Sequence, residues 1–165
     1  MPKKMLAFGR KVMITIRRIE EKDRDSVMEM MRVFYDSPAV FHTSSDQVLQ
    51  QDITDCIRDD FPFVDGFVFE KEGVEELLGY AMIAPSYTTE YGGLCVWLED
   101  LYVKPAYRRE GISTQFFTYL ESLFPQAVRF KLEVETENET AIASYKKNGY
   151  GISPYFEMTK EMTEG

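Results

Sequence analysis

Residues 97–121, WLEDLYVKPAYRREGISTQFFTYLE, decide the fold of this chain. The run 94–103 is rich in apolar and aromatic residues and lies between glycines and a proline, which predicts a strand. After a short basic turn, the segment from Gly111 has apolar residues at helical spacing, which predicts a helix. Such a turn exposes backbone N–H groups to anions, and Arg108 and Arg109 can add charge-assisted hydrogen bonds. The stretch therefore predicts a phosphate-binding turn between a strand and a helix.

The composition is typical of a globular domain. With 165 residues, 44% hydrophobic and 28% charged, the chain is predicted to form one domain over 1–165, with 1–11 as a loose leader. The formal net charge of −9 disfavours binding to nucleic-acid phosphate. The same charge either attracts a cationic small molecule or serves only solubility.

The apolar runs are too short for a membrane-spanning helix or a signal peptide, so we expect a cytoplasmic protein that does not bind membranes. Cys56 and Cys95 lack the spacing of a disulfide framework, which fits a reducing compartment. With His42 as the single histidine and no cysteine cluster, we expect no metal site.

Alternating and helical apolar patterns divide the rest of the chain into strands and helices. Together with the central stretch, they predict an α/β domain with a mixed sheet. The predicted strands are 12–19, a strand within 61–70, 77–86, 94–103, 128–134 and 155–162, and the predicted helices are 26–35, 45–59, 111–124 and 138–148.

The phosphate-binding turn resembles a signature of the GNAT acetyltransferase superfamily. Residues 108–113, RREGIS, are similar to its pyrophosphate-binding motif, Gln/Arg-x-x-Gly-x-Gly/Ala. Ser113 departs from the small residue usual at the last position, and its side chain narrows the approach of a phosphate. The turn is not a Walker P-loop, because no Gly-Lys-Ser/Thr follows it, and its single glycine does not make a dinucleotide fingerprint.

A second stretch, residues 138–150, NETAIASYKKNGY, resembles the other GNAT signature, Asn-x-x-Ala-x-x-x-Tyr-x-x-x-Gly-Phe/Tyr. The two signatures stand in the expected order, with a helix and a strand between them. The resemblance implies a GNAT-like fold, with a mixed, mostly antiparallel twisted sheet of six to seven strands and about four helices.

This resemblance also implies a binding site for acetyl-CoA, the acetyl donor. In the superfamily the pantetheine pairs with the central strand, and the pyrophosphate binds the N–H groups at the start of the following helix. The positions that correspond here are Leu101, Tyr102, Val103, Arg108, Arg109, Gly111, Ile112, Ser113, Thr114, Asn138, Ala141, Tyr145 and Lys147.

Two residues are candidates for the chemistry of acetyl transfer to an amine. Tyr145 stands where the superfamily keeps a general acid, and a phenol with a pKa near ~10 holds a proton that it can give to a thiolate. Glu99 is the candidate base, through a water, because an amine arrives mostly as ammonium and must lose a proton. In a regular strand Glu99 and Asp100 would point to opposite faces.

Residues 97–103, WLEDLYV, resemble the corresponding strand of the diamine acetyltransferases, which include the spermidine/spermine and thialysine N-acetyltransferases. This finer resemblance implies direct attack by the amine of a small polyamine-like or lysine-like acceptor, and a homodimer. Glu90, Tyr91 and Asp100 are the candidate acceptor-binding residues. Protein, peptide and aminoglycoside acceptors, or a coenzyme A-binding module without activity, remain the alternatives.

Overall fold

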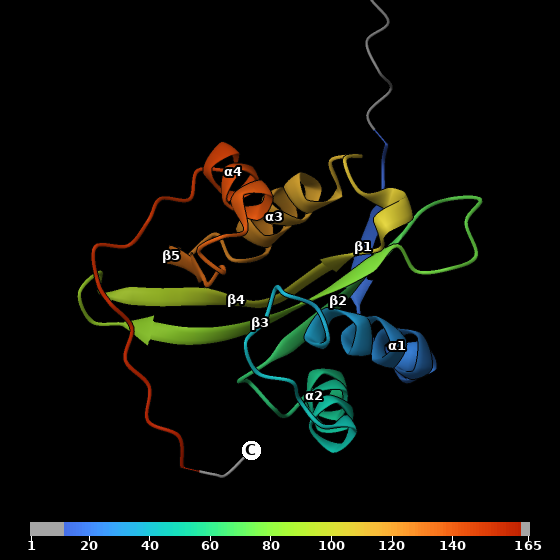
Figure 1. Cartoon of the computed structure of the whole chain (residues 1–165), viewed down its shortest axis with the longest axis horizontal. Helices are drawn as coiled ribbons and strands as arrows, with labels where there is room; N and C mark the ends of the chain where they lie inside the picture. Colours follow the sequence, from blue (N-terminus) through green and yellow to red (C-terminus); the bar gives the residue numbers. More distant parts are fainter. Residues whose placement is uncertain (1–11, 163–165) are drawn as a thin grey trace, which may run out of the picture.

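The computed structural model describes residues 12–162, so the predicted leader at 1–11 lies outside the described residues (Figure 1). The chain forms strands, α-helices and two short 3-10 helices. In chain order these are β1 (Thr15–Arg18), η1 (Glu21–Asp23), α1 (Arg24–Tyr35), α2 (Asp46–Ile57), β2 (Asp65–Glu70), β3 (Gly79–Thr88), β4 (Gly93–Val103), η2 (Pro105–Tyr107), α3 (Ile112–Leu123), β5 (Ala127–Leu132) and α4 (Glu139–Lys147).

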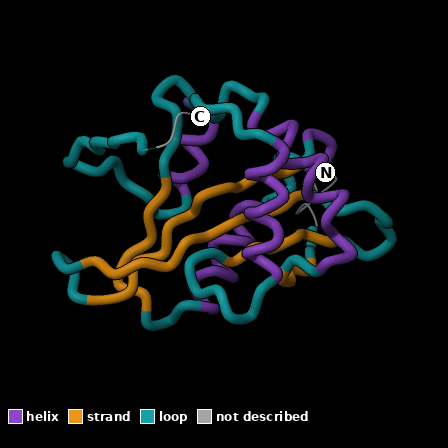
Figure 2. Tube along the Cα trace, turned by 90° about the horizontal axis from the view of Figure 1, so that it is seen from below, coloured by secondary structure: helices purple, strands orange, loops and turns teal. Residues whose placement is uncertain are grey.

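The five strands form one twisted sheet in sequential order, from β1 to β5 (Figure 2). The strands β1 to β4 pair antiparallel, and β4 and β5 pair parallel because α3 connects them across the sheet. The predicted mixed, mostly antiparallel α/β sheet is therefore confirmed. None of the helices within residues 12–162 is long and apolar enough to cross a membrane.

The predicted strand 155–162 is wrong. These residues are exposed and belong to neither a strand nor a helix, so the described sheet has five strands where six to seven were predicted. The sequence alternation there is typical of a strand, but a strand also requires a neighbour for its backbone N–H and C=O groups. The other predicted elements are present, with bounds shifted by a few residues.

Helices cover both faces of the sheet, with α1 and α2 on one face and α3 and α4 on the other (Figure 1). The alternation of β2 shows how the sequence separates the two layers. Val68 packs among residues of α1 and α2, whereas Phe67 and Phe69 pack against Phe116 of α3, and all four side chains are fully buried. Each layer thus buries one set of alternating apolar side chains.

The structural feature that positions the site is an opening between β4 and β5. Their parallel pairing ends at Leu98 and Leu132, whereas β4 continues to Val103. On its other side, β4 stays paired with β3 but has a bulge, in which Met82 lies opposite Asp100 and Ile83 lies opposite Leu98. Glu99 is therefore the extra residue of the bulge, at the point where the two strands separate.

Candidate active site

A cavity of about 1230 Å³ lies where β4 and β5 separate. Its walls come from the end of α1, the second half of β4, the turn before α3, the first turn of α3, the residues after β5, and α4. Fourteen of the residues singled out in the sequence line this cavity. They are Glu99, Leu101, Tyr102, Val103, Arg108, Arg109, Gly111, Ile112, Ser113, Thr114, Asn138, Ala141, Tyr145 and Lys147.

The turn before α3 has an unusual backbone. Gly111 has φ of +77°, and Arg109 has φ of +64°, a left-handed conformation that is uncommon for a residue with a side chain. No side chain caps α3, and the first backbone bond of the helix runs from the N–H of Gln115 to the carbonyl of Gly111. The N–H groups of residues 112–114 thus have no acceptor within the helix, which makes this turn suitable for an anion.

The left-handed conformation of Arg109 was not predicted. Nothing in the sequence signals it, since glycine, asparagine and aspartate are the residues that favour this region. Backbone strain of this kind is common where a loop is shaped for a ligand. Arg109 is also exposed, so its guanidinium is accessible beside the free N–H groups.

Arg108 folds back onto β4. Its Nε donates to the carbonyl of Val103 at 2.8 Å, and its guanidinium lies 5.7 Å from the ring centre of Tyr102. One of the backbone acceptors expected to face the pantetheine is therefore bonded by Arg108 in this structure. Because the bond is exposed to solvent, it can exchange for another donor at small net cost.

The helix α4 brings the second signature to the cavity. Asn138 caps this helix, since its side chain accepts from the N–H of Ala141 at 3.2 Å. Tyr145 packs edge-to-face against Phe117, with 6.0 Å between ring centres, and against Tyr150, with 6.1 Å. Burial raises the pKa of the Tyr145 phenol above its usual value, so the phenol stays protonated at neutral pH.

Carboxylates gather beside Glu99. Partial burial, and then the negative charges of Asp100 and Glu157, raise the pKa of Glu99. A hydrogen bond with Glu157, partial burial and the charges of Glu157 and Glu99 raise the pKa of Glu133 to about 7. Burial and the charges of Asp55 and Glu99 raise the pKa of Asp52, on α2, to about 6. Of these carboxylates, Glu99 and Glu133 line the cavity and give it a negative field where β4 and β5 separate.

Sequence reasoning missed Asp52, Glu133 and Glu157 as neighbours of Glu99. The parallel register brings Glu133 close to Glu99, because Leu132 lies opposite Leu98 and each glutamate is the next residue of its chain segment. That register is not readable from the sequence, and Glu157 lies in a segment that was predicted as a strand.

The three predicted acceptor-binding residues are not among those lining the cavity. Asp100 is only 3% exposed and accepts hydrogen bonds from the hydroxyls of Tyr35 and Tyr80, both at 2.8 Å. Glu90 and Tyr91 lie in the turn between β3 and β4, where Glu90 accepts from Tyr155 and Tyr91 stacks under Arg129. The hairpin carries Glu90 and Tyr91 beyond the cavity, and acceptor binding by these three residues stays a prediction.

Comparison with known proteins shows the family of this chain. The model of the acetyltransferase (GNAT) family matches residues 25–150. The chain belongs to this family. It is an enzyme, an acetyltransferase that takes its acetyl group from acetyl-CoA. No curated protein sequence matches it significantly.

Solved structures of other acetyltransferases share the fold. A possible acetyltransferase from Clostridium difficile 630 has a TM-score of 0.77 and 21% identity, over 92% of this chain and 99% of that chain. The aminoglycoside N-acetyltransferase AAC(6')-Iy in complex with CoA has a TM-score of 0.73 and 14% identity, over 93% of this chain and 98% of that chain. An aminoglycoside acetyltransferase from an uncultured soil metagenomic sample, in complex with sisomicin, has a TM-score of 0.67 and 12% identity, over 92% of this chain and 97% of that chain. At these identities the likeness shows the fold alone.

No group of three or more side chains able to hold a metal ion is found in the part of the acetyltransferase that the structure describes.

The buried carboxylate of Asp100 generates a testable prediction. Tyr80→Phe removes one of its two hydroxyl donors, and we expect the free energy of unfolding to fall by about 1.5–3 kcal/mol at about pH 8. Burial raises the pKa of Asp100 to about 6. Below that pH the carboxyl is protonated, and a neutral carboxyl gains less from the hydroxyl donor than a carboxylate does. The decrease in the free energy of unfolding caused by Tyr80→Phe should therefore be smaller at about pH 5.

Urea unfolding at the two pH values measures this effect. Tyr107→Phe is the matched control, because its hydroxyl also donates to a carboxylate, Glu76, but at an exposed site. An equal loss for Tyr80→Phe at both pH values would contradict the role of the ionised Asp100.

Proposed function

We propose that this acetyltransferase transfers the acetyl group to the primary amine of a small cationic acceptor, such as a polyamine or a lysine-like compound. The observation that carries this proposal is the convergence of both signatures on one cavity that also contains the carboxylates of Glu99 and Glu133. An ammonium group is attracted to such a negative field. The finer resemblance of residues 97–103 to the diamine acetyltransferases supports the same acceptor class.

The donor would bind along β4 and at the start of α3. The free N–H groups of residues 112–114, with Arg109 beside them, would hold the pyrophosphate. The edge of β4 that β5 leaves unpaired, at residues 101–103, would pair with the amides of the pantetheine. Asn138, Ala141 and Lys147 line the opposite wall, on α4.

Tyr145 and Glu99 would carry out the proton transfers as general acid and general base. Tyr145 keeps its proton at neutral pH and can donate it to the leaving thiolate. Glu99 would take a proton from the acceptor ammonium through a water, and its raised pKa makes it a stronger base than an ordinary glutamate.

Direct attack of the amine on the thioester of acetyl-CoA is consistent with the positions of the two cysteines. Cys56 and Cys95 are buried, and neither lines the cavity. Burial and the charges of nearby carboxylates raise the pKa of Cys56 to about 12, so it is not a nucleophile at neutral pH. The reaction therefore needs no acetylated cysteine.

Aminoglycosides are the second candidate acceptors. Two of the structurally similar proteins are aminoglycoside acetyltransferases, and these substrates also carry several ammonium groups. The carboxylates beside Glu99 suit either class, so the size of the acceptor decides between them. We also propose that residues 1–165 form a single acetyltransferase domain and that the enzyme acts as a homodimer.

An acceptor panel tests the proposed function. Thiol release from acetyl-CoA should rise with spermidine, putrescine or lysine analogues, and remain at background with short neutral peptides. Release with aminoglycosides alone would replace the proposed acceptor class by the second candidate. If no acceptor of the panel causes thiol release although coenzyme A binds, both acceptor classes are contradicted.

A matched pair of variants controls the panel. Gly111→Ala places a Cβ in the anion-binding turn, and Gly149→Ala introduces the same kind of strain after α4. Both glycines have positive φ, +77° and +90°, and a Cβ on either meets nothing within 4 Å. If the turn binds the donor, the rate of thiol release from acetyl-CoA should fall by about tenfold or more in Gly111→Ala and persist in Gly149→Ala.

The role of Tyr145 gives a second prediction. Tyr145→Phe should lower kcat by about 10²-fold or more, with little change in the affinity for coenzyme A, because only the proton donor is lost. Tyr150→Phe is the control, since Tyr150 packs against the same Phe117 ring but does not line the cavity. Steady-state kinetics with both variants decide the question, and an unchanged kcat in Tyr145→Phe would remove the assignment.

Glu99 gives a third prediction, in the pH profile. The carboxylate form is the base, so kcat/KM should decline as the pH falls through the raised pKa of Glu99. Glu99→Gln should lower the rate and flatten this acidic limb. Glu133→Gln is the comparison, because Glu133 has a pKa of about 7 and lies beside Glu99. If Glu133→Gln flattens the limb and Glu99→Gln does not, Glu133 is the base.

A further inference from the structure

A buried carboxylate lies at each end of α1 and joins it to the sheet. Within residues 12–162, Asp23 and Asp100 are the two buried charged side chains, at 5% and 3% exposure. Asp23 precedes the helix and accepts two hydrogen bonds from Arg17 of β1, at 2.7 and 2.9 Å. Asp100 of β4 accepts one at 2.8 Å from Tyr35, the last residue of α1. A buried carboxylate needs such donors, so both contacts are costly to break.

The bond from the Tyr35 hydroxyl to Asp100 is the one hydrogen bond between α1 and the strands in the described part of the chain. The two arginines of the helix, Arg24 and Arg32, donate instead to residues of η1 and α2. Apolar side chains pack the middle of the helix onto the sheet, but such packing has no preferred direction. The hydroxyl therefore sets where the end of α1 lies.

The contact made by Tyr35 lies directly behind the candidate base. Asp100 follows Glu99, which is the extra residue of the bulge. Tyr35 also packs edge-to-face against Phe34, with 5.2 Å between ring centres, and Phe34 lines the cavity with Glu99. Tyr35 itself does not line the cavity, so any effect on the reaction passes through the residues that it holds.

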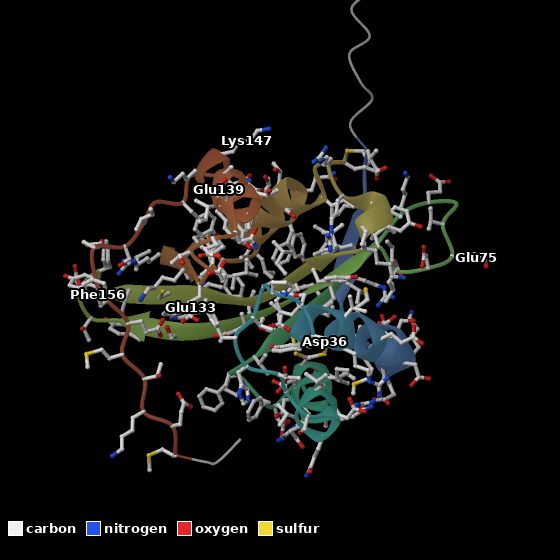
Figure 3. The ribbon with its side chains drawn as sticks, in the orientation of Figure 1. Asp36, Glu75, Glu133, Glu139, Lys147 and Phe156 are labelled. Atoms are coloured by element: carbon white, nitrogen blue, oxygen red, sulfur yellow. The ribbon has the colours of Figure 1, made fainter. Side chains whose placement is uncertain are left out.

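The chain after α1 forms a wall of the cavity with residues 37–39. Figure 3 labels Asp36, where the chain leaves the helix. The turn is bonded to the helix end, since the Ser37 hydroxyl donates to the carbonyl of Phe34 at 2.6 Å and accepts from the N–H of Ala39 at 3.3 Å. No hydrogen bond of residues 36–44 reaches a described strand. The wall therefore moves with the end of α1.

This wall is not used by the proposed binding of the donor. Acetyl-CoA would occupy the unpaired edge of β4, the turn before α3 and the inner side of α4. Residues 33–39 line the same cavity from α1 and the turn after it, together with Glu99 and Glu133. An acceptor amine that approaches Glu99 would therefore contact this wall.

We propose that Tyr35 is a positioning residue of this acetyltransferase: its bond to Asp100 holds the end of α1, and with it residues 37–39, at the distance from β4 that the acceptor requires beside Glu99. The inference rests on the proposed function, because it takes Glu99 as the base that meets the acceptor. Without the bond, the wall occupies its binding position for only a fraction of the time, and the apparent affinity for the acceptor falls by that fraction.

Two matched variants test this role in steady-state kinetics with spermidine. Tyr35→Phe and Tyr80→Phe each remove one of the two hydroxyls that donate to Asp100 at 2.8 Å. Tyr80, however, stays in place through the backbone pairing of β3 with β4. Tyr35→Phe should raise the KM for spermidine about tenfold, with kcat and the affinity for coenzyme A changed less than about threefold. Tyr80→Phe should change all three less than about threefold.

The kinetic comparison separates positioning from a general loss of stability. Both variants leave Asp100 with one donor, so both should lower the unfolding midpoint in urea by a similar amount. An equal rise of the spermidine KM in the two variants would overturn the proposal. A tenfold loss of affinity for coenzyme A in Tyr35→Phe would also overturn it, because the wall would then serve the donor.

Hydrogen exchange tests the same bond without an acceptor. The N–H groups of Asp36, Ser37 and Val40 are bonded within the turn, to the carbonyls of Arg32, Phe34 and Ser37. Their exchange should be about tenfold faster in Tyr35→Phe than in Tyr80→Phe, because only the first frees the end of α1. Equal exchange in the two variants would overturn the proposal. This measurement stays decisive if spermidine is not a substrate, so its failure is separate from that of the proposed function.

Discussion

The short parallel ladder between β4 and β5 is the constraint on which the active-site cavity depends. It ends at Leu98 and Leu132, because the bulge at Glu99 and the end of β5 carry the two strands apart. Had the ladder continued, the backbone of β4 would be covered and no cavity would remain at residues 101–103. The hydrophobic layers on both faces keep the sheet rigid on either side of this opening.

Two carboxylates that are adjacent in the sequence at this bulge have different surroundings. Asp100 is buried against Tyr35 and Tyr80, and so ties β4 to the end of α1 and to β3. Glu99 lines the cavity with Glu133. The same dipeptide therefore supplies one carboxylate to the packing of the fold and another to the field that a cationic acceptor would meet.

Much of the site was predictable because it is encoded locally. The turn at Gly111 and the helix that contains Tyr145 combine residue types at short, fixed spacings, and these spacings survive in any structure that forms the two helices. The positions of Glu133, Glu157 and Asp52 were not predictable. They approach Glu99 only through strand register and chain crossing, which connect residues far apart in the sequence.

The sequence by itself determined the α/β class, nearly all of the strands and helices, and the two signatures of the acetyltransferase family, because alternation, helical periodicity and glycine placement are local properties. Only the tertiary structure decided where β4 and β5 separate, which carboxylate is buried, and that residues 155–162 have no neighbour within the described sheet. A strand pattern specifies which face a side chain takes, but it does not specify a pairing partner, since hydrogen bonds between strands depend on what else lies beside them.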